Sequence, residues 1–93
     1  MRVALLVLLA VSTAAALKCY AGGTVNEHGV YSQGPCLAGE QYCRTIDLTT
    51  EGVHTVTKTC GLELCTAEGC EKVENGKICC CKGDLCNAPS PRS

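Results

Sequence analysis

The sequence predicts a small all-β, disulfide-rich domain, and three observations lead to this prediction. Ten cysteines occur among 93 residues, all of them at Cys19 or later. The chain contains no Trp, no Phe and only three Tyr, so its apolar core is small. Ordering each residue costs about 1.5 kcal/mol, which so few large apolar side chains cannot offset without cross-links. Segments rich in threonine and valine, separated by turn residues, then favour strands.

The N-terminal residues 1–16 have the pattern of a secretory signal peptide. Arg2 supplies a positive start, an apolar run follows, and Ala14 and Ala16 occupy the A-x-A positions that a signal peptidase requires. The apolar run is shorter than the roughly 20 residues of a membrane-spanning helix. We therefore expect cleavage before Leu17 and a secreted, extracellular product whose cysteines are oxidised.

The remainder is predicted to be one domain over residues 17–87, followed by a flexible C-terminal tail over 88–93. Without Arg2, seven basic residues stand against nine acidic ones, giving a net charge of −2. This charge argues against a nucleic-acid partner and against binding to an anionic membrane. The tail lacks the apolar stretch of about 10–20 residues in a glycolipid-anchor signal. We expect a monomer with no membrane anchor.

The segment from Cys43 to Cys60 is predicted to form a β-hairpin. β-branched residues flank Glu51-Gly52, which supplies the turn. A turn centred between these two residues pairs the following across the hairpin: Cys43 with Cys60, Asp47 with Val56, and Thr49 with His54. The opposite face then carries Ile46, Leu48, Val53, Thr55 and Thr57. A turn shifted by one residue would invert the two faces.

Two further features concern the C-terminal third of the chain. Asn75-Gly76 predicts a tight turn between Val73 and Ile78. The run Cys79-Cys80-Cys81-Lys82-Gly83-Asp84-Leu85-Cys86-Asn87 follows. Neighbouring cysteines do not readily bond to each other, so the three adjacent cysteines require three separate partners.

Both ends of the domain resemble the three-finger superfamily of Ly-6/uPAR domains, snake toxins and activin-receptor ectodomains. The similar segments are Leu17-Lys18-Cys19-Tyr20 and the CCxxxxCN run that ends at Asn87. The cysteine triplet is close to that of the activin type II receptor ectodomain. The resemblance implies three hairpin loops, or fingers, that extend from a cysteine-rich base.

The resemblance also implies specific contacts in the base. The implied disulfides are Cys19–Cys43, Cys36–Cys60, Cys65–Cys80, Cys70–Cys79 and Cys81–Cys86. Asn87 would form hydrogen bonds across the base and lock it. A Ly-6 domain usually carries a cysteine at the position of Gly22. The disulfide bond that this cysteine forms with a nearby partner staples finger one. Because that staple is missing, we expect residues 20–35 to be the least ordered loop.

Fingertips are where three-finger proteins usually contact their partners. The candidate partner-binding residues are therefore Asn26, Glu27, His28 and Tyr31 in finger one, and Thr50, Glu51, Val53 and His54 in finger two. Tyr31 is the foremost candidate, because an aromatic residue in a polar loop is a typical interface anchor. We expect a ligand or modulator of an extracellular receptor or ion channel. Two alternatives are a soluble growth-factor-binding decoy of activin-receptor type and a structural secreted component.

The sequence does not predict an enzyme or a metal protein. His28 and His54 fall on different loops, and nothing around Ser32 indicates a nucleophile. The C-terminal cysteine run lacks the histidine that a secreted phospholipase would require. Cysteines oxidised in pairs are not available as thiolate ligands. We therefore expect no catalytic residue, no bound metal and no cofactor.

Overall fold

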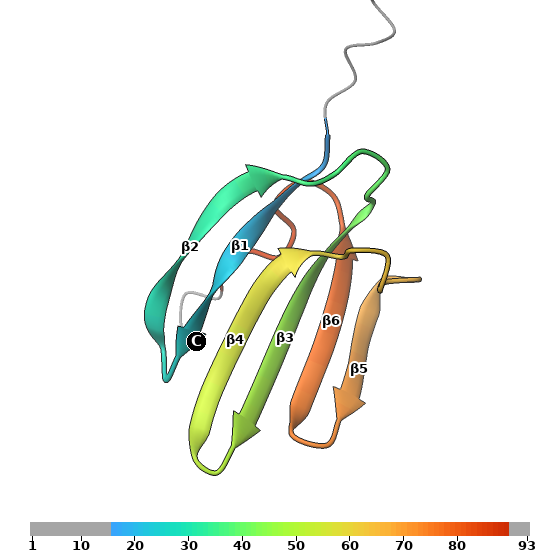
Figure 1. The fold of residues 1–93 in the computed structure, drawn as a ribbon. Helices are drawn as coiled ribbons and strands as arrows, with labels where there is room; N and C mark the ends of the chain where they lie inside the picture. The colour runs from blue at the N-terminus through green and yellow to red at the C-terminus, as the bar shows by residue number, and fades with distance from the viewer. Residues whose placement is uncertain (1–15, 90–93) are drawn as a thin grey trace, which may run out of the picture.

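The computed structural model describes residues 16–89, which form one six-stranded antiparallel sheet (Figure 1). The strands are β1 (Lys18–Val25), β2 (His28–Pro35), β3 (Tyr42–Thr50), β4 (Val53–Cys60), β5 (Gly69–Val73) and β6 (Gly76–Lys82). Their order across the sheet is β2-β1-β4-β3-β6-β5. The hairpins β1–β2, β3–β4 and β5–β6 are fingers one, two and three. The predicted all-β, three-finger class is confirmed.

Both termini extend beyond the described part of the chain. Residues 1–15 of the predicted signal peptide and residues 90–93 of the predicted tail lie outside the described residues. Between residues 16 and 89 there is no helix, and hence none with the length and apolar character needed to cross a membrane.

The core lies at the base of the fingers and consists of disulfides. Cys19, Cys36 and Cys43 are its buried residues, and Leu17, Cys60 and Cys81 pack against them. The Sγ atoms of Cys19 and Cys36 are 3.3 Å apart, so their two bridges pack against each other. All five bridges of the chain are Cys19–Cys43, Cys36–Cys60, Cys65–Cys80, Cys70–Cys79 and Cys81–Cys86. These are the same pairs that the resemblance implies.

Asn87 joins the C-terminal segment to two strands of the base. Its Oδ1 accepts a hydrogen bond from the Tyr20 N–H at 2.9 Å. Its Nδ2 donates to the carbonyl oxygens of Tyr20 at 3.1 Å and Arg44 at 3.4 Å. One buried amide therefore connects β1, β3 and the chain after the last disulfide.

Finger two has the predicted register. Cys43 pairs with Cys60, Asp47 with Val56 and Thr49 with His54, which confirms the turn at Glu51-Gly52. Both turn residues have positive φ, 52° for Glu51 and 82° for Gly52. Such a two-residue turn matches the right-handed twist of the flanking strands, and this match fixes the register.

Finger one is a regular hairpin, so the expectation of a poorly ordered loop over 20–35 is wrong for its backbone. β1 and β2 pair from Lys18–Pro35 to Val25–His28, and β1 also pairs with β4. At the tip, the Asn26 N–H donates to the His54 carbonyl at 2.6 Å, and the His54 N–H donates to Asn26 Oδ1 at 2.9 Å. Hydrogen bonds to finger two thus replace the missing staple.

Finger three turns one position earlier than the sequence predicts. Its turn residues are Glu74 and Asn75, whereas Gly76 begins β6 and pairs with Val73 and with Leu48 of β3. A Cβ atom on Gly76 would lie 1.9 Å from the Asp47 carbonyl oxygen. This glycine is therefore required for the close approach of β6 to β3 rather than for the turn.

We predict that Gly76→Ala lowers the free energy of unfolding by about 1–3 kcal/mol, because the added methyl group forces β6 away from β3. Urea unfolding of the oxidised protein measures this change. Gly34→Ala is the matched control, since a Cβ atom there has no neighbour within 4 Å. Equal stability of the two variants would show that β6 does not lie this close to β3.

Candidate functional site

The two faces of the sheet have different chemistry: the pocket face borders a large cavity, and the open face carries exposed valines. The pocket face borders a cavity of about 690 Å³, which is also lined by Ala88 and Pro89. All six strands contribute to this lining. The open face is the opposite side, which includes Val25, Val30 and Val53. In Figure 1 the C-terminal segment passes behind the sheet, so the open face is turned toward the viewer.

Lys58 is the central charged group of the pocket face. It is only 7% exposed, although it is a lysine in the middle of a single sheet. Its Nζ donates to Thr45 Oγ1 at 3.3 Å and lies 5.5 Å from the centroid of the Tyr31 ring. Gly22 pairs with Tyr31 on one side and with Lys58 on the other, so no side chain separates the ring from the ammonium. The pair is a cation–π contact that joins finger one to finger two.

The electrostatics of Lys58 follow from its burial. Loss of hydration lowers the pKa of Lys58 below its usual value of 10.5, and the nearby Asp47 carboxylate opposes part of that change. Asp47 Oδ1 itself lies 2.9 Å from His54 Nε2, within hydrogen-bond distance. Within residues 16–89, Asp47 thus contacts His54 and does not pair directly with Lys58.

Tyr31 is held in place on the pocket face rather than projecting freely from its loop. It is half-buried, its hydroxyl lies 3.2 Å from Thr24 Oγ1, and it donates to the Val56 carbonyl at 3.5 Å. These contacts bring together residues of β1, β2 and β4. The arrangement orients the ring over Lys58.

The structure distributes the candidate partner-binding residues over three places. Glu27, Tyr31 and His54 line the cavity of the pocket face. Strand alternation directs His28 and Val53 to the open face. Asn26, Thr50 and Glu51 lie at the tips, where the Asn26 side chain is already bonded to His54. The eight residues therefore lie on both faces and at the tips of fingers one and two instead of forming one cluster.

Sequence reasoning missed Lys58, Thr45 and Thr24. The hairpin register does place Thr45 opposite Lys58, on the same face as Asp47, so part of the signal was available. The sequence contained no signal for the position of finger one beside β4. Ser32 follows Tyr31 in β2 and therefore points to the open face, whereas His54 lies on the pocket face. The two residues are not brought together.

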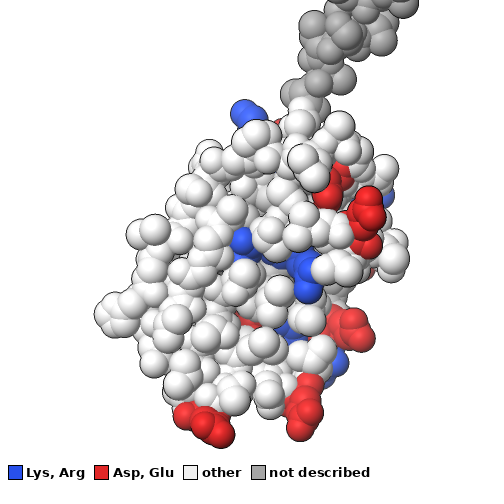
Figure 2. All heavy atoms as spheres, viewed as in Figure 1, with Lys and Arg blue, Asp and Glu red and all other residues white. Residues whose placement is uncertain are grey.

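The open face over β1, β2 and β4 carries no Lys, Arg, Asp or Glu and is partly apolar, while Arg44 of β3 lies on the same face near the base. Val30 is 82% exposed, Val25 53% and Val53 42%. Thr55 and Thr57 of β4 lie on the same face beside these valines. Figure 2 shows this face, with a broad uncharged area over β2 and β1 and acidic residues at the fingertips and at the opposite edge.

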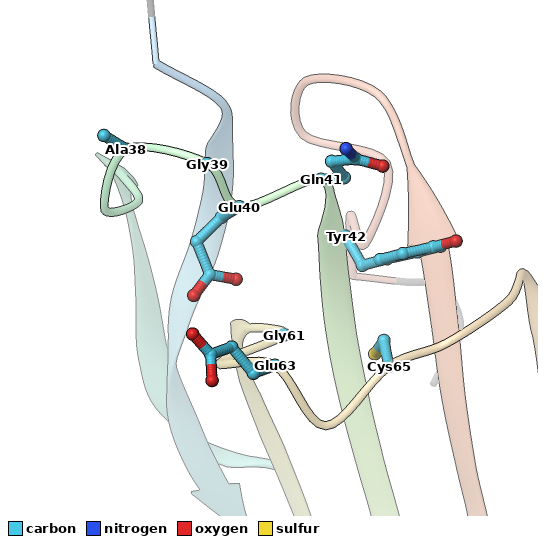
Figure 3. A pocket seen from close by; sticks show the side chains of 8 residues that line it. All are labelled: Ala38, Gly39, Glu40, Gln41, Tyr42, Gly61, Glu63 and Cys65. Carbon is cyan, nitrogen blue, oxygen red and sulfur yellow. The ribbon is translucent and has the colours of Figure 1, made fainter.

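A smaller cavity, of about 230 Å³, lies in the base between the loop before β3 and the loop after β4. Figure 3 shows the carboxylates of Glu40 and Glu63 pointing toward each other across it. Glu40 Oε1 accepts a hydrogen bond from the Leu62 N–H at 2.9 Å, so this carboxylate ties one loop to the other. The Tyr42 hydroxyl likewise donates to the Thr66 carbonyl at 3.3 Å. These contacts close the base.

The sulfur atoms of the base do not offer a metal site. The Sγ atoms of Cys19, Cys36 and Cys60 lie within 4.8 Å of one another. Each of them belongs to a disulfide bond. A disulfide sulfur has no thiolate charge to donate, so their proximity reflects the packing of two bridges.

Comparison with known proteins identifies the family. The sequence model of the family described as snake toxin and toxin-like protein matches residues 17–87. Ly6/PLAUR domain-containing protein 6 of Rattus norvegicus and that of Mus musculus are each 39% identical over 66 residues, which cover 62% of this chain and 38% of the relative. The chain thus matches less than half the length of these relatives, and no solved structure gives a significant match. By its matched residues, its six-stranded sheet and its five bridges, the chain belongs to the snake toxin and toxin-like family of the Ly-6/uPAR superfamily.

Proposed function

We propose that this chain is a secreted, non-enzymatic binding protein that modulates an extracellular receptor or ion channel. In this proposal it contacts the target through the open face of fingers one and two. The observation that carries the proposal is the exposure of Val25, Val30 and Val53 on the part of the open face over β1, β2 and β4, which carries no Lys, Arg, Asp or Glu. Exposed apolar patches of this kind mark protein interaction sites.

The rigidity of this surface supports the proposal. β1 pairs with β4, and Asn26 and His54 exchange two hydrogen bonds at the tips, so fingers one and two form one sheet. Valine and threonine have few rotamers, so ordering them at an interface costs little side-chain entropy. A preorganised apolar surface retains more of its contact energy as affinity.

The family supports the same class of function. Its members are generally non-enzymatic proteins that bind extracellular protein targets, and their disulfide-rich domains are typically extracellular or secreted. All ten cysteines are bridged, which suits an oxidising compartment. The predicted signal peptide over residues 1–16 adds to this support.

The test is affinity capture from membrane and extracellular fractions with the folded, oxidised protein, followed by direct binding to each captured candidate. We expect a receptor or channel to be captured. The double variant Val25→Ser/Val30→Ser should bind it at least tenfold more weakly, a loss of about 1.4 kcal/mol. Capture of a dimeric growth factor would instead favour the decoy alternative.

Leu64→Ser is the matched control for this experiment. Leu64 is 65% exposed, as apolar as the valines, and lies in the loop between β4 and β5, at the base end of the sheet. We expect the control to bind as the unmodified protein does. Equal losses in the control and the double variant, or no loss in either, would overturn the role of the open face.

A further inference from the structure

We propose that the cavity of the pocket face is a binding site for a small organic carboxylate, whose anionic group pairs with the Lys58 ammonium and whose apolar body fills the cavity. This site lies on the side of the sheet opposite the open face. The proposal therefore does not depend on the function proposed above.

The first step concerns the unused hydrogen-bonding capacity of Lys58. An ammonium group has three N–H donors. Within residues 16–89, the hydrogen-bond partner of the Lys58 ammonium is Thr45 Oγ1, and the residue is only 7% exposed. In this part of the chain the Asp47 carboxylate contacts His54 Nε2 and forms no direct ion pair with Lys58. A buried cation without a direct counter-ion is costly, and an anion that reaches it recovers that cost.

The second step is the shape and chemistry of the cavity. Its volume of about 690 Å³ falls within the roughly 300–1,000 Å³ of small-molecule sites. Its lining combines Val56, Pro89, the Tyr31 ring and the Cys70–Cys79 disulfide with the Lys58 side chain. These apolar groups beside the one buried lysine of the lining suit a ligand with one negative group and an apolar remainder.

The third step is the set of charges around Lys58. Asp47 lies on β3, His54 on β4, Lys77 on β6 and Glu27 at the tip of finger one, and all four line the cavity. The two carboxylates lie toward the fingertips from Lys58, and Lys77 pairs with Asp47 in the register of β3 and β6. An anion is therefore best accommodated on the base side of Lys58, away from Asp47 and Glu27. This favours a monoacid over a multiply charged phosphate.

The Thr45 hydroxyl provides a second hydrogen-bond donor for a bound carboxylate. Thr45 Oγ1 accepts from Lys58 and can donate its own proton to a bound carboxylate. Burial lowers the pKa of Lys58 in the free protein. A bound carboxylate should raise it, because an opposite charge favours the ammonium form. Binding should accordingly weaken as the pH rises through the pKa of Lys58.

The experiment is an NMR titration of the full oxidised protein with 4-phenylbutyrate, with the neutral 4-phenylbutyramide as the ligand control. We expect saturable shifts at Lys58, Thr45 and Tyr31, at least tenfold tighter binding of the acid, and an upward shift in the titration of the Lys58 ¹³Cε signal. Lys58→Met should remove the preference for the acid. Lys82→Met, a control on β6 outside this cavity, should retain it.

Three results would overturn the proposal. These are equal affinity for acid and amide, acid binding by Lys58→Met as tight as by the unmodified protein, and absence of saturable binding up to about 50 mM. If Lys58→Met does not fold, Thr45→Val serves in its place, since it leaves the lysine present but removes the hydroxyl. Thr45→Val should weaken acid binding several-fold without changing the affinity for the amide, and unchanged acid binding would count against the site.

Discussion

Replacement of Cys36 and Cys60 by serine is expected to unfold the protein at 37 °C. This bridge spans a sequence separation of 24 residues and closes a loop whose entropy alone is worth about 3.5 kcal/mol. It also packs against the Cys19–Cys43 bridge, and Cys36 is one of three buried residues of the core. Its removal therefore costs packing as well as entropy, and small domains of this kind have little stability to spare.

Replacement of Cys70 and Cys79 by serine provides the comparison. This bridge spans a separation of 9 residues, closes a hairpin worth about 2.7 kcal/mol in loop entropy, and has an exposed member in Cys70. The hairpin keeps its pairing with β3, so fingers one and two should stay folded. Thermal melts by circular dichroism distinguish the two variants. Equal loss in both, or the reverse order, would contradict the role assigned to the base.

Asn87→Asp is expected to cause the second large effect. It should lower the free energy of unfolding by about 3 kcal/mol or more at neutral pH. The side-chain Nδ2 donates to two carbonyl oxygens, those of Tyr20 and Arg44. A carboxylate of the same shape has no donor, and it brings a buried negative charge against both oxygens. Since Asn87 is 5% exposed, water cannot take the place of the lost donor.

The pH dependence of that loss identifies its cause. Burial beside two carbonyl oxygens favours the protonated form of the introduced carboxyl group, so its pKa in the folded state should be raised. The folded variant then binds more protons than the unfolded chain, and its stability falls as the pH rises from about 4 toward 7. Urea unfolding at about pH 3.5 and pH 7 measures the difference. Asn75→Asp adds the same charge at an exposed turn. Its free energy of unfolding should change little at either pH.

Sequence reasoning predicted finger two well because its register depends on local chemistry. Glu51-Gly52 forms the turn, and the pairing of Cys43 with Cys60 follows by counting outward from it. The pairs that the resemblance implies are the same as the bridges of the structure. The register of finger two thus rests on neighbouring residues, whereas the pairing rests on the resemblance at both ends of the domain.

Finger one was not predictable in the same way, because glycines in a sequence can indicate either a mobile loop or a close approach of two strands. Gly22 and Gly29 have φ of 137° and 142°, and a Cβ atom on either would lie within 2.5 Å of a neighbouring carbonyl oxygen. Glycines that indicate a mobile loop in the sequence here allow β1 and β2 to approach closely. The contact of Tyr31 with Lys58 depends on β1 lying beside β4, which no local pattern specifies.

The strand order has a consequence for how the chain acquires its bridges. Both cysteines of finger one, Cys19 and Cys36, have their partners in finger two, at Cys43 and Cys60. In the secreted protein that we propose, a chain that emerges from its N-terminus into an oxidising compartment exposes these two thiols before either correct partner is present. Their sulfurs lie side by side in the final core, so an early bond between them is geometrically accessible. If that bond forms, native pairing requires thiol–disulfide exchange with Cys43 and Cys60, so the bridges of finger one are completed only when finger two is present.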